Sequence, residues 1–272
     1  PPTTRNPFNV QCTPGGSSSG SAVAVATGMC MAALGTQTAG SILRPASYCG
    51  VCGWKPSFTP ESIMDGIAPI SFHLDHVGSM ARTVADFRIL HNVMVDNKNQ
   101  NEPAPSAASN VAPPVLVRLD QYFWDNADVA TRKAFQKAID KLCEAEWKDA
   151  PRLPDSFDHV HEHHATIMAV DAAQVHAKAF ATQPEKFSPK ITALLQQGLR
   201  KISLPHYVTS LQHQQRFSME MAQLMVREDN ASSVWIMPCT PATAPGPETT
   251  GDTRFNLPWS YCGFPAVTIP CG

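Results

Sequence analysis

The segment from residue 15 to residue 56 constrains the fold of this 272-residue chain more than any other. It begins with the glycine- and serine-rich turn GGSSSG (15–20) and contains a second such turn, TQTAGS (36–41). Small apolar residues suited to a tightly packed helix lie between the turns (SAVAVA, 21–26). Glycine permits backbone angles that other residues avoid and leaves N–H groups accessible. We therefore predict that one helix and one short strand bring Ser17 and Ser41 together.

These two turns resemble the signature of the amidase signature family, serine hydrolases that cleave carboxamides with a Ser-Ser-Lys triad. The resemblance continues in CGVCGWKP (49–56) and LDHVGSMARTVAD (74–86) and returns in PWSYCGFPAVTIPCG (258–272). It implies an α/β fold, in which a mixed, twisted β-sheet core is covered by helices on both faces. Residues 1–272 would form a single partial domain, with a mainly helical cover over the substrate pocket at about residues 120–230.

The resemblance also assigns roles within the two turns. Ser41 matches the nucleophile, and Ser17 matches the bridging serine, which the family holds with a cis peptide bond. The residues expected to form the oxyanion hole and bind substrate are Thr38, Ala39, Gly40 and Ser18. A serine hydroxyl becomes a strong nucleophile when a base removes its proton, and a desolvated lysine can be that base through a second hydroxyl.

The second turn departs from the family pattern. The family usually has Asp-Thr-Gly-Gly-Ser-Ile-Arg, where this chain has QTAGSIL (37–43), with Arg44 one place later. An amide at Gln37 removes a charge near the oxyanion loop. This change implies a different subgroup or a different support for the loop.

The family's catalytic lysine lies several tens of residues before the bridging serine, and no lysine precedes Ser17 here. The first lysine, Lys55, matches a structural motif that follows the nucleophile. His76 lies in an ordered turn and is expected to pack rather than to act as an acid or base. The chain is therefore expected to be an interior fragment whose base lies outside it, and the activity of this chain alone stays open.

Composition excludes several classes of protein. The net charge of −2 provides no basic field for nucleic acid. No run of about 18 apolar residues and no signal-peptide layout is present, so neither a membrane span nor secretion is expected. Eight cysteines scattered over a large domain favour reduced thiols in a cytoplasmic protein.

Two further motifs each have a structural and a functional interpretation. The run DHVHEHH (158–164) could converge on zinc, but it continues into an amphipathic pattern and lacks partner ligands elsewhere, so a helix face is favoured. Cys49 and Cys52 have thioredoxin-like spacing without a redox context. We expect neither a metal nor another cofactor.

Three functions remain open at this point. The leading one is a stand-alone amidase acting on a small-molecule amide, and a homodimer is left open as its assembly. The second is the glutaminase component of a tRNA-dependent amidotransferase. The third is an inactive fragment or a homologue that only binds a ligand or partner.

Local patterns predict several elements outside the signature. Residues 66–70 are expected to be strand-like, 75–80 an ordered turn, and 81–95 a helix with Thr83 as its N-cap. Pro189 is expected to open a helix, and a long helix should run over 204–227. The expected strands of the second half lie at 115–117, 234–238 and 265–272.

Overall fold

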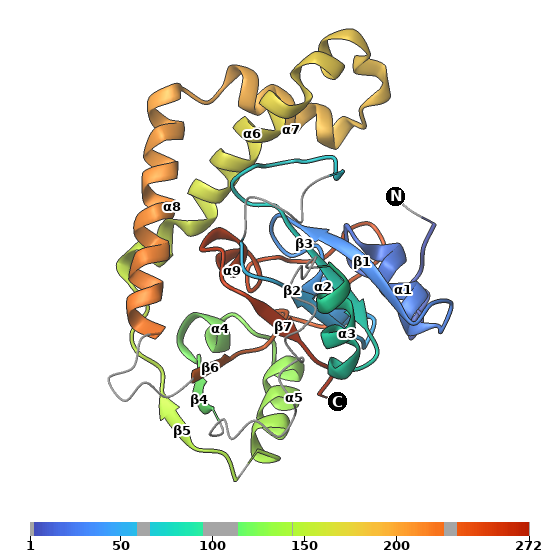
Figure 1. Cartoon of the computed structure of the whole chain (residues 1–272), viewed down its shortest axis with the longest axis vertical. Helices are drawn as coiled ribbons and strands as arrows, with labels where there is room; N and C mark the ends of the chain where they lie inside the picture. The colour runs from blue at the N-terminus through green and yellow to red at the C-terminus, as the bar shows by residue number, and fades with distance from the viewer. Residues whose placement is uncertain (1–2, 59–65, 95–113, 143, 226–232, 272) are drawn as a thin grey trace.

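A computed structural model of the chain describes residues 3–58, 66–94, 114–142, 144–225 and 233–271 (Figure 1). The strands are β1 (Ala32–Gln37), β2 (Cys52–Lys55), β3 (His76–Ala81), β4 (Val115–Arg118), β5 (Trp147–Asp149), β6 (Ser233–Ile236) and β7 (Ala266–Thr268). The helices are α1 (Ser19–Ala26), α2 (Leu43–Tyr48), α3 (Val84–Met94), α4 (Gln121–Asp125), α5 (Val129–Asp140), α6 (Val160–Thr182), α7 (Pro189–Arg200), α8 (Leu204–Met225) and α9 (Leu257–Tyr261). Two short 3-10 helices, η1 (Asp155–His159) and η2 (Pro184–Lys186), precede α6 and α7.

The signature segment builds an antiparallel sheet with the strand order β1-β3-β2-β7. As predicted, one helix (α1) and one strand (β1) separate the two glycine-rich turns. The central strand β3 is buried along its whole length. At Gly78, a Cβ atom would lie 2.1 Å from the carbonyl oxygen of Trp54, so only glycine lets β2 pass this closely.

Helices cover both faces of this sheet. Ala22 and Val25 of α1 and Ala46 of α2 pack against Met80 of β3 on one face. Phe87 of α3 packs on the other face, against neighbouring residues of β2 and β3. The short helix α1 can lie close to the strands because its side chains on this face are small.

Two local predictions are wrong. Residues 66–70 form turns and bends rather than a strand, because the N–H groups of Ile70 and Ser71 donate to the carboxylate of Asp75 instead of to a neighbouring strand. Residues 75–80 are largely strand rather than turn, since β3 begins at His76 and pairs with β1 and β2. The pairing of β3 is long-range, which a local pattern does not reveal.

The helix predicted after β3 is confirmed. Thr83 and Asp86 form a reciprocal cap at the start of α3, with Asp86 N donating to Thr83 Oγ1 at 3.4 Å and Thr83 N donating to Asp86 Oδ2 at 3.2 Å. Likewise α7 begins at Pro189, where the side chain of Ser188 accepts a bond from Ile191 N. The polar segment 97–114, which is rich in proline, alanine and serine and is expected to be an exposed connection, falls almost wholly outside the described residues.

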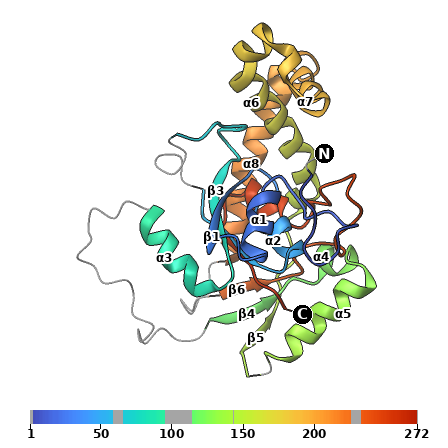
Figure 2. The same cartoon turned by 90° about the vertical axis from the view of Figure 1, so that its right-hand side faces the viewer.

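The second half of the chain adds a parallel sheet with the order β5-β4-β6 and a group of long helices. Figure 2 shows this sheet next to α5, on the side of the molecule opposite α6 and α7. Helices α6 and α8 pack together, and their buried residues Ile167 and Phe217 join Trp259 and Tyr261 of α9 in the largest core cluster. The predicted α/β fold is confirmed. Within the described residues, none of the helices combines the length and apolarity needed to cross a bilayer.

Candidate active site

The two glycine-rich turns lie against each other. The backbone N–H of Ser18 donates to the carbonyl oxygen of Ser41 at 3.2 Å. The peptide bond between Gly16 and Ser17 is cis, as the family resemblance implies. The Ser17 side chain is exposed and Ser41 is half-buried, so both residues have access to the surface of this junction.

A buried arginine holds the first turn in place by hydrogen bonds to backbone carbonyl groups. Arg44, in α2, donates to the carbonyl oxygen of Gly16 at 2.5 Å and to that of Gly251 at 2.6 Å. Desolvation by burial lowers the pKa of Arg44. Gly15 has a φ of 80°, and a Cβ atom there would lie 2.7 Å from Pro45 Cα, so glycine is required for the turn to rest on α2.

Gln37 supports the second turn at its base. Its side-chain oxygen accepts bonds from the N–H groups of Ile42 and Leu43 at 2.9 and 3.0 Å. Its side-chain nitrogen donates to Ser260 Oγ in α9 at 3.0 Å, and that hydroxyl donates to the carbonyl oxygen of Ala39 at 3.0 Å. The amide therefore still accepts backbone bonds, and it adds a donor that a carboxylate would lack.

One histidine of the 158–164 run contacts the second turn. His164 of α6 is buried, and its Nε2 lies 3.0 Å from the carbonyl oxygen of Thr38. Burial lowers the pKa of His164 to about 4, so the imidazole is neutral near pH 7 and Nε2 donates its hydrogen to this carbonyl. Sequence reasoning treated the run as a helix face and missed this contact, because nothing local to α6 indicates residue 38.

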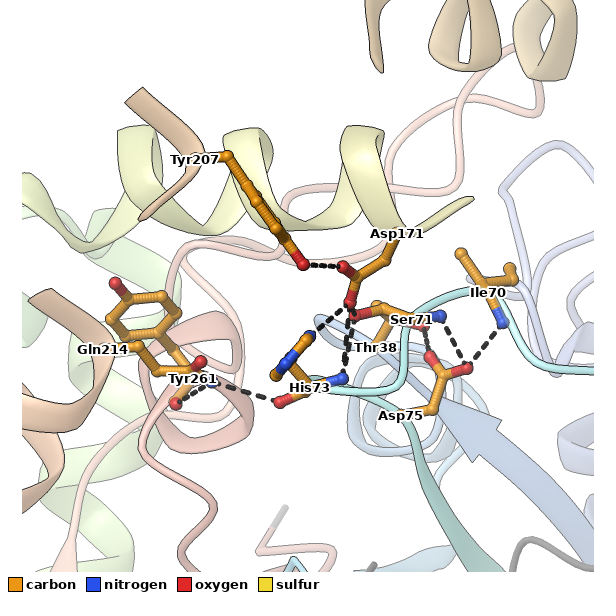
Figure 3. Close-up of polar contacts among 9 residues, drawn as sticks. All are labelled: Thr38, Ile70, Ser71, His73, Asp75, Asp171, Tyr207, Gln214 and Tyr261. Atoms are coloured by element: carbon orange, nitrogen blue, oxygen red, sulfur yellow. Dashed lines mark hydrogen bonds and ion pairs between the residues drawn. The ribbon is translucent and has the colours of Figure 1, made fainter. Parts of the chain in front are cut away.

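The 70–75 loop also holds the second turn (Figure 3). Thr38 Oγ1 donates to Asp75 Oδ1 at 2.5 Å, while Asp75 Oδ2 accepts the N–H groups of Ile70 and Ser71 at 2.6 and 3.0 Å. Asp75 therefore links the loop to the turn through both of its carboxylate oxygens. The sequence indicated Asp75 only as part of the family resemblance.

Asp171 of α6 joins this loop to the helices that lie over it. Figure 3 shows its carboxylate between Tyr207 of α8 and the Ser71–His73 segment. It accepts bonds from Tyr207 OH at 2.6 Å and Ser71 Oγ at 2.5 Å, and it lies 2.8 Å from His73 Nδ1. Burial would raise the pKa of Asp171, but the bonds from His73, Ser71 and Tyr207 outweigh burial and lower it. The bond to Asp171 raises the pKa of His73.

Lys55 of β2 and His76 of β3 are both buried within the antiparallel sheet, and His76 also contacts the second turn. Lys55 Nζ donates to the carbonyl oxygen of Pro56 at 3.0 Å, and burial lowers its pKa to about 7. His76 Nδ1 faces two carbonyl oxygens, those of Leu74 at 2.8 Å and Gln37 at 3.3 Å, so this nitrogen must carry the hydrogen. Burial lowers the pKa of His76 to about 3, which keeps the ring neutral.

No group of three or more His, Cys, Asp and Glu side chains among the described residues is arranged to hold a metal ion. His163 instead stacks on His213 of α8, with ring centroids 4.1 Å apart. Burial raises the pKa of Cys49 to about 12 and also raises that of Cys52, which disfavours the reactive thiolates.

Comparisons with known proteins identify relatives of this chain by sequence and by fold. The A component of the glutamyl-tRNA(Gln) amidotransferase of Hahella chejuensis is 30% identical over 98% of this chain and 63% of its own length. The protein of the same name from Desulforapulum autotrophicum is 46% identical over 55% of this chain and 31% of its own length. A crystal structure of an amidase superposes with a TM-score of 0.84 at 30% identity and covers 97% of this chain and 61% of that one.

The chain thus spans less than two thirds of the length of these relatives. A structure of 6-aminohexanoate cyclic dimer hydrolase, at 20% identity and a TM-score of 0.77, shares the fold. The model of the family described as Amidase matches residues 2–272. That match extends over nearly all 272 residues, so the chain belongs to the amidase signature family.

Proposed function

We propose that this chain carries the nucleophile, the bridging serine and the oxyanion hole of an amidase. Ser41 Oγ attacks the carbonyl carbon of a carboxamide while Ser17 passes its proton to a base. The N–H groups of Thr38, Ala39 and Gly40 hold the oxyanion. The C–N bond then breaks, ammonia or an amine leaves with a proton, and water hydrolyses the acyl-Ser41 ester to a carboxylate.

The observation that carries this proposal is the bond from Ser18 N to Ser41 O, because it joins the turn that contains Ser17 to the turn that contains Ser41. Ser18 is proposed to line the substrate site at this junction. An oxyanion-hole donor is worth about 3–4 kcal/mol of transition-state stabilisation, so a loop with several aligned N–H groups supplies much of the rate.

The base is proposed to be a lysine that is not among these 272 residues. Lys55, the first lysine of the sequence, directs its ammonium group to the Pro56 carbonyl rather than to either serine. The depressed pKa of Lys55 follows from burial in the sheet, which is sufficient to explain it without a catalytic role. Residues 1–272 on their own are therefore expected to be slow catalysts.

Residues of about 120–230 are proposed to cover the substrate pocket as one mainly helical region of a single domain. Two contacts support this part of the proposal. His164 of α6 reaches Thr38 in the second turn, and Asp171 of α6 binds the loop that holds Thr38. The substrate is proposed to be a small linear amide that is bound between this cover and the two turns.

Fluorophosphonate labelling tests the assignment. The full-length protein should take the label at Ser41, and Ser41→Ala should abolish both labelling and amide hydrolysis. Ser17→Ala should lower the rate on the order of 10³-fold or more, as removal of a proton-relay group does in other serine hydrolases. Ser57→Ala, at an exposed serine outside the turns, is the matched control and should leave the rate unchanged.

A label on a serine other than Ser41 would contradict the assignment. A full-length protein with neither label nor activity would favour the inactive, ligand-binding homologue. If residues 1–272 stay unlabelled while a longer form is labelled, the base lies outside this chain, as proposed.

A second candidate function is the hydrolysis of glutamine to supply ammonia to a partner protein. Both curated relatives described above are named as components of a glutamyl-tRNA(Gln) amidotransferase, which favours it. Assays with glutamine and with simple aliphatic amides separate the two functions, since a glutaminase component should prefer glutamine and co-purify with a partner. Under the first proposal, the protein should instead hydrolyse other amides. We then expect it to form a homodimer and to be located in the cytoplasm.

A further inference from the structure

Three consecutive carbonyl groups in the second turn accept hydrogen bonds from three buried side chains of distant elements. The carbonyl oxygen of Gln37 faces His76 Nδ1 at 3.3 Å, that of Thr38 faces His164 Nε2 at 3.0 Å, and that of Ala39 faces Ser260 Oγ at 3.0 Å. All three donors are at most 3% exposed.

The direction of a carbonyl fixes the direction of the N–H group in the same peptide unit. A trans peptide is planar, and its C=O and N–H point to opposite sides. The carbonyls of Gln37, Thr38 and Ala39 share peptide units with the N–H groups of Thr38, Ala39 and Gly40. When the carbonyls are held toward the protein interior, these N–H groups are turned away from it.

The N–H groups of Ala39 and Gly40 accordingly make no hydrogen bond within the described part of the chain. Gly40 has no room for a side chain, because a Cβ atom would lie 2.9 Å from Asn256 Oδ1. The turn is therefore held on one side by its carbonyls and left open on the other by its N–H groups.

We propose that His76, His164 and Ser260 are positioning residues that aim the oxyanion-hole N–H groups at the substrate. This inference rests on the proposed function. A hydrogen bond to a peptide carbonyl also polarises the unit, so each held carbonyl strengthens its N–H as a donor. The three residues contact carbonyl oxygens of the turn, so their proposed effect reaches the reaction through the backbone.

His164 offers the sharpest test because its two ring nitrogens can be mimicked separately. In His164→Gln the side-chain amide takes the place of Nε2 and can still donate to the Thr38 carbonyl. In His164→Asn the amide takes the place of Nδ1 and cannot reach it. His176→Asn, three turns further along α6, is the matched control, since its ring contacts Phe187 rather than the turn.

In the full-length protein we expect His164→Asn to lower kcat on the order of 10-fold to 100-fold with KM changed by less than about 3-fold, because the bond acts on the transition state. His164→Gln should recover most of kcat, and His176→Asn should match the wild type. A Gln variant as slow as the Asn variant, or an Asn variant with unchanged kcat, would overturn the inference. An increase in KM alone would also overturn it.

A spectroscopic measurement separates this inference from the proposed function. The ¹⁵N resonances of the His164 ring should show hydrogen on Nε2 and none on Nδ1 at neutral pH, whether or not the protein is active. Hydrogen on Nδ1 would overturn the inference alone. A wild-type protein that neither reacts with the fluorophosphonate nor hydrolyses amides would instead overturn the proposed function. The three contacts would then have no role in catalysis.

Discussion

The guanidinium of Arg44 holds the carbonyl oxygen of Gly16, the residue immediately before Ser17, at a distance of 2.5 Å. The same group binds the carbonyl of Gly251 and the hydroxyl of Thr250, so one buried side chain joins α2, the first turn and the 250–251 loop. Arg44 is 5% exposed, and the bonds from its two terminal nitrogens replace part of the water that the cation loses on folding, while Nε has no hydrogen-bond partner among the described residues.

Replacement of Arg44 by methionine should destabilise the protein by about 3 kcal/mol, because the buried carbonyl oxygen of Gly16 and the half-buried one of Gly251 lose charge-assisted bonds. Urea unfolding measures this change. Arg216→Met is the matched control, since Arg216 is 71% exposed and forms an ion pair with Glu220 that should contribute less than about 1 kcal/mol. Equal losses of stability in the two variants would contradict this account of Arg44.

Replacement of Asp171 by asparagine should remove a pH-dependent share of stability. The folded-state pKa of Asp171 is lowered, so its contribution is present above the unfolded pKa and is lost as pH falls through the folded one. The folded-state pKa of His73 is raised, so its contribution is present below the unfolded pKa and is lost as pH rises through the folded one.

The stability difference between wild type and Asp171→Asn should therefore be greatest between about pH 4 and pH 6.5, the unfolded pKa values of these groups. Chemical unfolding at several pH values measures it. Asp155→Asn is the control, because Asp155 is 88% exposed and pairs with exposed Arg152. A difference that is constant from about pH 3 to about pH 8 would show that the Asp171–His73 pair contributes nothing through its charges.

His164 should make the protein less stable in acid. Its folded-state pKa of about 4 lies below the unfolded value of about 6.5, so the unfolded chain binds more protons between these values. The free energy of unfolding should fall by about 3 kcal/mol from this group as pH falls from about 7 to about 4. In His164→Gln this share should vanish, while His76 and His213, whose pKa values are also lowered by burial, leave a smaller slope. Identical slopes in both proteins would contradict the prediction.

Replacement of Gln37 by glutamate tests the neutral support of the second turn. The introduced carboxyl keeps the acceptor oxygen that receives the N–H groups of Ile42 and Leu43, but when ionised it loses the donor to Ser260. Ser260 would then donate to the carboxylate and release the Ala39 carbonyl. The ratio of variant to wild-type kcat should decline with rising pH, by about 10-fold or more once the group is ionised. A ratio independent of pH would count against this role for Gln37.

The sequence predicted correctly those parts of the fold that depend on interactions between residues close together in the chain. The two glycine-rich turns, α1 and β1 between them, the cap at Thr83 and the start of α7 at Pro189 all depend on residues within a few positions of one another. Their signals are steric freedom at glycine and short side-chain bonds to nearby N–H groups. Features of this kind can be predicted from a single sequence.

The side-chain contacts that hold the candidate active site join residues far apart in the sequence, and they could not be predicted from it. His164 lies 126 residues from Thr38, and Asp171 lies 100 residues from Ser71. An acid within the apolar face of α6 indicates a buried partner but not which one. The 70–75 loop misled for a related reason, because Asp75 satisfies backbone groups that a strand would otherwise satisfy.

The bond from Ser260 to the Ala39 carbonyl spans 221 positions of sequence. During synthesis, the ribosome must therefore add all of these positions before the second turn can receive this support. A nascent chain that already exposes Ser41 would still lack the contact. On the proposed function, efficient hydrolysis would have to wait until Ser260 has left the ribosome, so a half-made chain would expose the nucleophile without the means to use it.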